Sequence, residues 1–248
     1  MLERDVAPGV HRLGHANVNC YLIEGDGDQL TLVDAGLPAF WPLLGRALRE
    51  LGRRPDALAA LVLTHAHFDH LGVARRLQDR YGVPVSGHEK EHDLARHPYR
   101  YAHENVRGIY PLRYPRAVPI LGAMTKAGAL TVKGVTGVAS FEGGSVLEVP
   151  GRPRVVFSPG HTFGHCALHL PDRDALLSGD ALVTLDPYTA RTGPRIVAGA
   201  ATADSAMALR SLDALAATQA RTVLPGHGEP WHGGAAAAAS EARAAGPA

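Results

Sequence analysis

Apolar residues follow two alternating patterns along this chain. Short apolar runs, typical of β-strands, lie within residues 10–34 and at 59–63, and stripes at helical spacing lie within 40–51 and 71–81. Gly52 and Gly82 end the two stripes, as glycine commonly does at the C-terminal end of a helix. The first part of the chain therefore predicts strands and helices in alternation.

The same alternation returns after residue 140. Strands are predicted at 145–149, 154–158, 166–170, 175–178 and 222–224. A helical stripe over 209–216 precedes the last strand, with Thr202 or Asp204 near its cap. Because no linker separates the two parts, we expect a single domain over residues 1–232. Its two similar halves would pack sheet against sheet, with the helices outside.

Residues 98–140 interrupt this pattern. A short helix is expected before them, from Glu89 to Arg96, and Pro98 would end it. The segment shows neither helical nor strand periodicity, and it contains Tyr99, Tyr101, Tyr110 and Tyr114. Long irregular segments in compact domains are usually functional or mobile. We therefore expect a lid or a segment that faces the substrate, with an oligomer contact or a solvated excursion as the alternative.

The last predicted strand is followed by an alanine-rich tail, residues 233–248. Alanine favours a helix locally, but the tail lacks large apolar side chains that would hold it against the domain. We therefore expect the tail to fray.

Composition and charge narrow the class of protein. Of the 248 residues, 46% are hydrophobic and 20% are charged, as expected of a soluble globular protein. The formal net charge of +1 gives no indication of a nucleic-acid partner or an anionic membrane. No apolar run approaches the ~18 residues of a membrane span. We expect Cys20 and Cys166 to be buried thiols, and the lack of a signal pattern favours the cytoplasm.

The strongest chemical signal is the run His65-Ala66-His67-Phe68-Asp69-His70, which follows the strand predicted at 59–63. Alternate side chains of an extended segment share a face, so His65 and His67 can point the same way. Four ligands so close in the chain would crowd around one cation. We therefore assign His65 and His67 to one metal ion. Asp69 and His70 are assigned to a neighbouring ion. Imidazole and carboxylate suit zinc best, with iron or manganese possible.

Three later turns each place a metal-competent side chain directly after a predicted strand. They are Pro159-Gly160-His161, Ser178-Gly179-Asp180 and Pro225-Gly226-His227. Glycine lets the backbone bend sharply at each strand end, so that the side chain can face inward. We expect His161, Asp180 and His227 to complete the metal site.

Two further polar residues have alternative roles. Asp34 leaves a predicted strand beside a helix start, where an aspartate is usually a cap. It can instead orient a metal-bound histidine. His165 has the chemistry of a ligand, and we expect it to support the site or the fold without binding metal.

The sequence resembles the metallo-β-lactamase-fold superfamily. The matching elements follow the order of the family and span nearly the whole chain; they are residues 32–36, 64–72, 160–162, 178–180 and 226–228. The resemblance implies an α+β fold, an αβ/βα sandwich with the site at one edge between two mixed sheets. It also implies a ligand set in which Asp180 bridges two divalent ions. The first would be held by His65, His67 and His161, and the second by Asp69, His70 and His227.

The resemblance further implies a metal-dependent hydrolase of small molecules. In such a site a hydroxide shared by two metal ions attacks a carbonyl or phosphoryl centre. Lactonase-like members match this chain in length and in the bridging aspartate, so we expect a carboxylic ester, lactone or thioester as substrate. Asp69 is a candidate proton relay. Tyr188, on the loop that leaves Asp180, is a candidate hydrogen-bond donor to the substrate carbonyl.

Other activities remain open from the sequence. A phosphodiesterase would use the same metals, and one iron ion per chain would favour oxidation of a sulfur substrate. True β-lactamases of the family usually have Cys or Ser at the position of Asp180, so β-lactam hydrolysis is expected only as a side activity. A metal-binding domain without catalysis is a further alternative.

Overall fold

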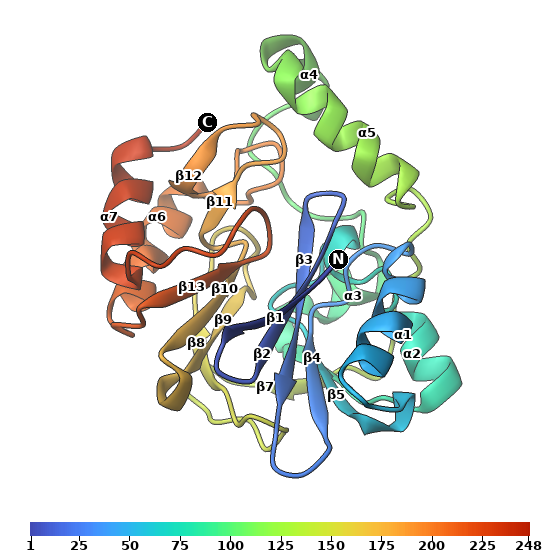
Figure 1. The fold of residues 1–248 in the computed structure, drawn as a ribbon. Coiled ribbons are helices and arrows are strands. Elements are labelled where there is room, and N and C mark those ends of the chain that lie inside the picture. The colour runs from blue at the N-terminus through green and yellow to red at the C-terminus, as the bar shows by residue number, and fades with distance from the viewer.

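Two β-sheets face each other in the computed structural model, which describes residues 1–248 (Figure 1). The larger sheet has seven strands in the order β1-β2-β3-β4-β5-β6-β7. Their bounds are β1 (Leu2–Ala7), β2 (Val10–His15), β3 (Val18–Glu24), β4 (Leu30–Val33), β5 (Leu58–Val62), β6 (Val85–His88) and β7 (Ala139–Phe141). Strands β1 to β4 pair antiparallel and β4 to β7 pair parallel, so the sheet is mixed.

The smaller sheet is also mixed. Its four strands lie in the order β13-β10-β9-β8, and only β13 and β10 pair parallel. The bounds are β8 (Arg154–Phe157), β9 (Cys166–Leu170), β10 (Ala175–Gly179) and β13 (Thr222–Pro225). A separate two-stranded ribbon is formed by β11 (Val183–Leu185) and β12 (Thr192–Arg195).

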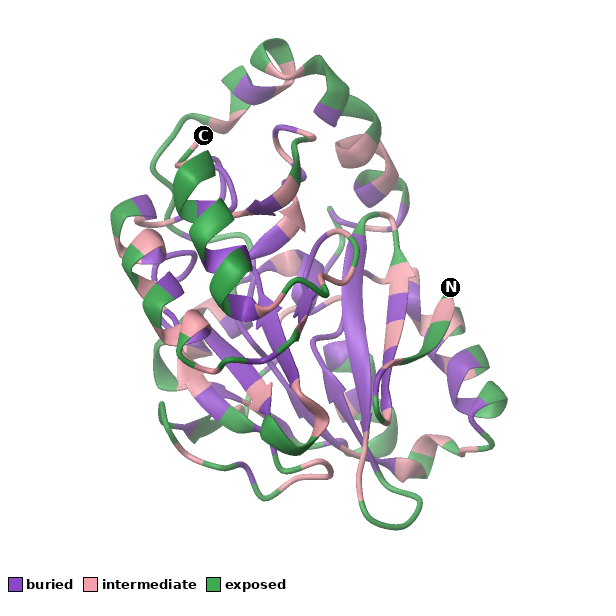
Figure 2. Ribbon diagram, turned by 60° about the vertical axis from the view of Figure 1, so that its left-hand side comes forward, coloured by how far each residue is buried: buried purple, intermediate pink, exposed green.

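Three hydrophobic layers hold the fold together. Side chains of β3 alternate between faces, so Tyr21 and Ile23 point toward the second sheet while Cys20 and Leu22 point toward the outer helices. The layer between the sheets also contains Leu168 and other buried residues of the second sheet. Figure 2 shows these buried strands between helices that are exposed on their outer sides. The predicted α+β architecture is confirmed.

Helices cover both outer faces. On the first sheet lie α1 (Phe40–Glu50) and α2 (Ala74–Tyr81), whose buried side chains join one core cluster with that sheet. On the second sheet lie α6 (Ser205–Ala216) and α7 (Ala235–Ala245), which contact each other and the strands beneath. The Asp204 carboxylate caps α6 by accepting a hydrogen bond from the backbone N–H of Met207. No helix combines the length and the hydrophobicity that a membrane span requires.

The alanine-rich tail is helical, which corrects the expectation that it frays. Ala235, Ala238, Ala239 and Ala242 of α7 are buried against α6 and the second sheet. They recur at helical spacing, so one face of the helix is apolar although no side chain on it is large. Small side chains allow two helices to approach closely. The contact therefore does not need the large anchors that we considered necessary.

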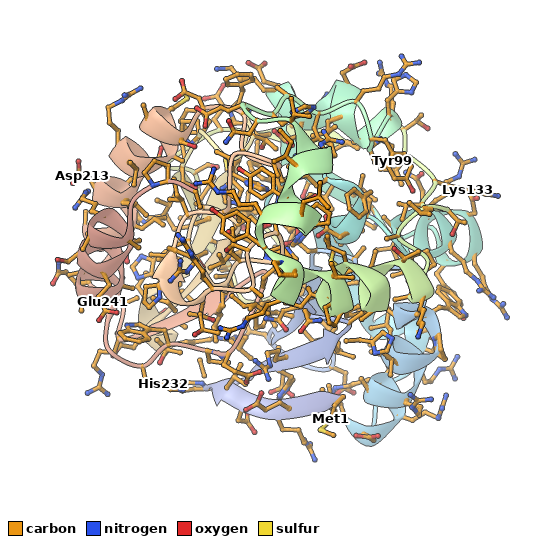
Figure 3. The ribbon with its side chains drawn as sticks, turned by 90° about the horizontal axis from the view of Figure 1, so that it is seen from above. Met1, Tyr99, Lys133, Asp213, His232 and Glu241 are labelled. Atoms are coloured by element: carbon orange, nitrogen blue, oxygen red, sulfur yellow. The ribbon has the colours of Figure 1, made fainter.

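Residues 98–140 are more regular than the sequence indicated. They follow α3 (His92–Arg96) and contain α4 (Tyr110–Arg113) and α5 (Val118–Lys126), which extend over the top of the molecule (Figures 1 and 3). Met124, near the end of α5, is buried in the cluster of α1 and α2. The short helices escaped prediction because prolines lie at their first turns and their apolar residues do not form one stripe.

Some strand assignments also differ. No strand forms at 145–149, where Val146 makes a single bridge to Arg154. The three-residue strand β7 lies a few residues earlier, and its first two residues are exposed. Short, exposed or glycine-containing strands such as β7 and β12 give little periodicity, so only their pairing partners reveal them.

Candidate metal centre

Five segments that follow β-strands bring their polar side chains to one edge between the two sheets. In the first sheet, β4 leads to Asp34 and β5 to residues 64–70. In the second, β8 leads to residues 158–165, β10 to Asp180 and β13 to His227. Because β4, β5, β10 and β13 are strands of parallel pairs, their C-terminal ends meet at this edge.

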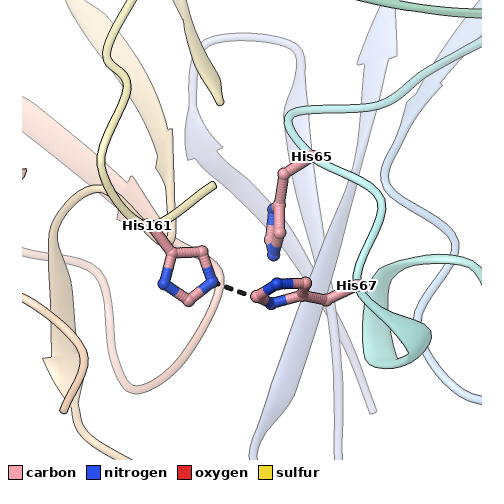
Figure 4. Close-up of side chains that lie close together, drawn as sticks. All are labelled: His65, His67 and His161. Atoms are coloured by element: carbon pink, nitrogen blue, oxygen red, sulfur yellow. Dashed lines mark hydrogen bonds between the residues drawn. The ribbon is translucent and has the colours of Figure 1, made fainter. Parts of the chain in front are cut away.

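His65, His67 and His161 form one compact group, which we call the three-histidine group. One ring nitrogen of each lies within 4.8 Å of the others. Nε2 of His161 lies 3.0 Å from Nδ1 of His67, and Figure 4 shows the three rings converging. All three side chains are buried.

Asp69, His70 and His227 form a second compact group, also within 4.8 Å. Nε2 of His227 lies 3.3 Å from Oδ2 of Asp69, and Nε2 of His70 lies 3.9 Å from the same oxygen. The motif thus contributes side chains to both groups, and a third cluster of Asp34, His65 and His70 links them.

Asp180 lies between the two groups. Its carboxylate oxygens are 3.5 Å from Nε2 of His161 and 4.0 Å from Nε2 of His65, on one side. On the other side they are 3.5 Å from Nε2 of His70 and 3.2 Å from Nε2 of His227. A Cβ atom at Gly226 would overlap the Asp180 carboxylate, so this approach requires glycine there.

The donor set fits divalent metal ions. Nε2 of His65, His67 and His70 and Oδ1 of Asp180 are buried without a hydrogen-bond partner. Buried polar atoms are normally paired, and four such atoms at one place suit the binding of a cation. Burial lowers the pKa of His161 to about 3 and that of His65 well below its usual value. These neutral imidazoles keep a free lone pair for a metal.

The two carboxylates of the site are ionised. Burial alone would raise the pKa of Asp180, but His227, His70 and His161 hold it well below its usual value. The pKa of Asp69 is lowered for the same reason, since His70 and His227 outweigh the effect of burial. Burial lowers the pKa of His70, but Asp180, Asp34 and Asp69 raise it to about 9, and Asp180 likewise raises the pKa of His227 well above its usual value. A bound metal ion would displace these two protons, and the site would then combine neutral nitrogen donors with anionic oxygen donors, as zinc and iron sites do.

Asp34 orients the turn of residues 64–70 and does not cap a helix. Its carboxylate accepts hydrogen bonds from the backbone N–H and the hydroxyl of Thr64, both at 2.8 Å. Its Oδ2 also lies 3.0 Å from Nδ1 of His70. The contact leaves Nε2 of His70 free to face the site.

Two other imidazoles of the site are oriented in a similar way. Nδ1 of His227 lies 2.6 Å from the carbonyl oxygen of Asn17, and Nδ1 of His161 lies 3.3 Å from the Thr202 hydroxyl. His165 lies beside the donor groups, with its ring 5.2 Å from that of His65. Its Nε2 accepts hydrogen bonds from the backbone N–H groups of Asp180 and Ala181, and its Nδ1 contacts Ser158. These contacts hold the backbone of Asp180 in place and occupy both ring nitrogens of His165.

Sequence reasoning missed Glu91. This residue follows β6 and precedes α3, and its side chain is almost fully buried. Its carboxylate accepts hydrogen bonds from the backbone N–H groups of Ala66, at 2.8 Å, and Gly164, at 2.9 Å. Burial raises its pKa. A glutamate in a short polar helix has no sequence signal that separates it from a solvated one.

Aromatic side chains line the approach to the donor groups. The ring of Tyr101 lies 4.0 Å from that of His67, and the Arg107 guanidinium lies 4.0 Å from the centre of the Tyr101 ring. The Tyr188 hydroxyl lies 3.4 Å from that of Tyr101. Burial, followed by the proximity of Tyr101, raises the pKa of Tyr188 well above its usual value. Its phenol therefore stays protonated and can donate a hydrogen bond. Tyr101 was one of four tyrosines in 98–140, and the sequence could not single it out.

A narrow cavity joins these aromatic residues to the donor groups. It is lined by His67, Phe68, Asp69, Tyr101, His161, Asp180, Pro187, Tyr188, Val197, Ala201 and His227. Neither lysine nor arginine is among them. The cavity thus has metal-competent side chains at one end and an apolar, partly phenolic wall.

Known proteins resemble this chain over most of its length. A sequence model of the metallo-beta-lactamase superfamily matches residues 13–227. The probable metallo-hydrolase YflN of Bacillus subtilis is 28% identical over 248 residues, covering 92% of this chain and 87% of the relative. The probable metallo-hydrolase YqgX of the same organism is 26% identical over 171 residues, covering 68% of each protein.

Solved structures share the fold. TTHA1429, a metallo-beta-lactamase family protein from Thermus thermophilus, is 30% identical with a TM-score of 0.70, covering 96% of this chain and 79% of that one. TTHA1623, solved in a di-iron-bound form, is 26% identical with a TM-score of 0.63. Its superposition covers 89% of this chain and 92% of that one.

Proposed function

Because this chain belongs to the metallo-β-lactamase superfamily and is a metal-dependent hydrolase, we propose that it holds two divalent ions and hydrolyses a carboxylic ester, lactone or thioester. One observation carries the proposal. Seven buried imidazole and carboxylate side chains converge beside a small cavity that has an apolar wall and no lysine or arginine in its lining.

In this proposal each group of three side chains holds one ion. The three-histidine group would hold the first, and Asp69, His70 and His227 would hold the second. Asp180 is close to both groups, which supports a bridging role. We propose zinc as the metal, and the di-iron form of TTHA1623 makes iron the principal alternative.

Bound divalent ions supply an activated water at neutral pH and a counter-charge for a developing oxyanion. The chain supplies the proton transfers and the orientation. Asp69 is ionised and lies at the cavity, so its carboxylate can accept a proton and pass it to the leaving group. The Tyr188 hydroxyl can donate a hydrogen bond to the substrate carbonyl oxygen.

The cavity wall supports the choice of substrate. Phe68, Tyr101, Tyr188 and Val197 give the cavity an apolar and phenolic wall that suits an uncharged acyl group. The cavity is only about 10 Å³ in volume, so the wall has to move outward to admit a substrate. A phosphodiester carries a negative charge, and enzymes that bind phosphates usually supply arginine or lysine to it. The absence of both from the cavity lining favours the ester class over the phosphodiester class.

A substrate panel on protein of known metal content tests this proposal. We expect two metal ions per chain and turnover of chromogenic esters, lactones or thioesters that exceeds turnover of phosphodiesters and β-lactams by at least roughly 100-fold, or ~2.7 kcal/mol in activation free energy. Preferred turnover of the phosphodiester would contradict the substrate class. One iron ion per chain with oxidation of a sulfur substrate would contradict hydrolysis.

A further inference from the structure

Glu91 is a buried carboxylate that the proposed reaction does not use. Its side chain has no ion-pair partner, and the two backbone N–H groups of Ala66 and Gly164 satisfy one oxygen each. A buried charge without a cation is costly unless such donors compensate it. The two N–H groups offset this cost only while they stay in place beside the carboxylate, so the contact links their positions to that of Glu91.

The two donors belong to the segments that carry the three-histidine group. Ala66 lies between His65 and His67 on the turn after β5, which is part of the first sheet. Gly164 lies three residues after His161 on the loop between β8 and β9 of the second sheet. A single carboxylate therefore ties together two ligand segments that come from different sheets.

The contact with Glu91 leaves no room for a side chain at position 164. A Cβ atom there would lie 2.6 Å from Oε1 of Glu91 and 2.9 Å from its Cγ. Any side chain at position 164 would push the carboxylate away. Glu91 does not contact the second donor group, where Asp34 contacts His70 and the Asn17 carbonyl contacts His227. Asp34 also binds Thr64, whose hydroxyl lies 3.0 Å from Nδ1 of His65, so Glu91 shares the support of the three-histidine group with Asp34.

We propose that Glu91 is a positioning residue that fixes the spacing of His65, His67 and His161 and thereby sets the affinity of this group for its metal ion. The inference rests on the proposed metal centre. It differs from a general structural role because it predicts a selective effect, on one of the two metal sites.

Glu91→Gln is the sharpest variant. Glutamine has nearly the same size, but it offers one acceptor oxygen, and its NH₂ group would face the N–H of the second donor. Gly164→Ala disturbs the same contact from the other side. Asp174→Asn is the matched control, because Asp174 accepts a hydrogen bond from the backbone N–H of Arg221 at the opposite end of β10.

Zn²⁺ affinity of metal-free protein, measured against a competing chelator, is the test. His227→Ala leaves the three-histidine group complete, and His161→Ala leaves the second group complete. In the His227→Ala background we expect Glu91→Gln to weaken Zn²⁺ binding roughly 10- to 100-fold, as expected for a residue that orients ligands. In the His161→Ala background, Glu91→Gln should leave the Zn²⁺ affinity near its starting value. Asp174→Asn should leave the Zn²⁺ affinity unchanged in both backgrounds.

A double-mutant cycle locates the effect. If Glu91 and Gly164 act through one contact, Glu91→Gln and Gly164→Ala together should weaken binding by less than the product of their separate effects. Circular dichroism of each metal-free variant confirms that it is folded. If Glu91→Gln does not fold, Gly164→Ala alone decides: unchanged Zn²⁺ affinity of the three-histidine group overturns the proposal.

These measurements distinguish a failure of the Glu91 proposal from a failure of the proposed metal centre. Wild-type protein that binds two zinc ions while Glu91→Gln binds them equally well would overturn the role of Glu91 alone. An equal loss at both sites would show a general structural role and would also overturn it. Wild-type protein that binds no zinc would overturn the metal centre, and the role of Glu91 with it.

Discussion

Asp69 has two tasks in the proposed site, since it belongs to the second donor group and faces the cavity. Asp69→Asn keeps an oxygen donor but removes the base. We expect kcat to fall by roughly 100-fold or more, a typical contribution of a positioned proton acceptor. The measurement is turnover of the best panel substrate with the metal content of each preparation determined. A fully metallated variant with wild-type turnover would show that Asp69 relays no proton.

Tyr188 offers a test of substrate binding that leaves the donor groups intact. Tyr188→Phe removes only the hydroxyl, which lies 3.4 Å from that of Tyr101. We expect kcat/KM to fall roughly 10-fold, or ~1.4 kcal/mol, about the net value of one hydrogen bond. Metal content should not change. If kcat/KM is unchanged on every ester, lactone and thioester tested, the phenol has only a packing role.

Individual residues show where sequence reasoning succeeds and where it ends. The ligand candidates from His65 to His227 could be predicted because each has metal-ligating chemistry and follows a predicted strand. The sequence leaves Asp34 open between a helix cap, which local propensity favours, and a carboxylate that orients a histidine, and only its contacts with Thr64 and His70 distinguish the two roles. Glu91 and Tyr101 act through tertiary contacts, so their type and spacing carry no signal.

At the scale of elements, the strand ends matter most. Strands β5, β10 and β13 were predicted from their apolar runs, and their turns carry most of the donor set. The exact pairing was not predictable, because pairing between residues far apart in the chain depends on tertiary contacts. The short ribbon β11–β12 and the helices α4 and α5 were missed because their local patterns are weak.

Helix α7 gives an element-scale prediction. Ala238 is fully buried against the second-sheet layer, whereas Ala237 of the same helix is exposed. Ala238→Leu would overpack this contact, and we expect it to lower the free energy of unfolding by about 1–3 kcal/mol. Ala237→Leu is the control and should change it little. Urea unfolding of both variants provides the measurement, and a frayed tail would make the two variants equally stable.

At the scale of the whole molecule, the site exists only when both sheets are assembled. His65, His67, Asp69 and His70 come from the first sheet, and His161, Asp180 and His227 come from the second. The layer of apolar side chains between the sheets therefore holds the two halves of the donor set in register. Segment 98–140 adds Tyr101 to the cavity wall, and we propose that it acts as a lid over the substrate.

Anomalous diffraction from crystals of the zinc-loaded protein tests the central claim most directly. The account predicts two zinc peaks about 3.5–4 Å apart. One should lie among His65, His67 and His161 and the other among Asp69, His70 and His227, with Asp180 in contact with both. A single peak, or peaks away from these side chains, would contradict it.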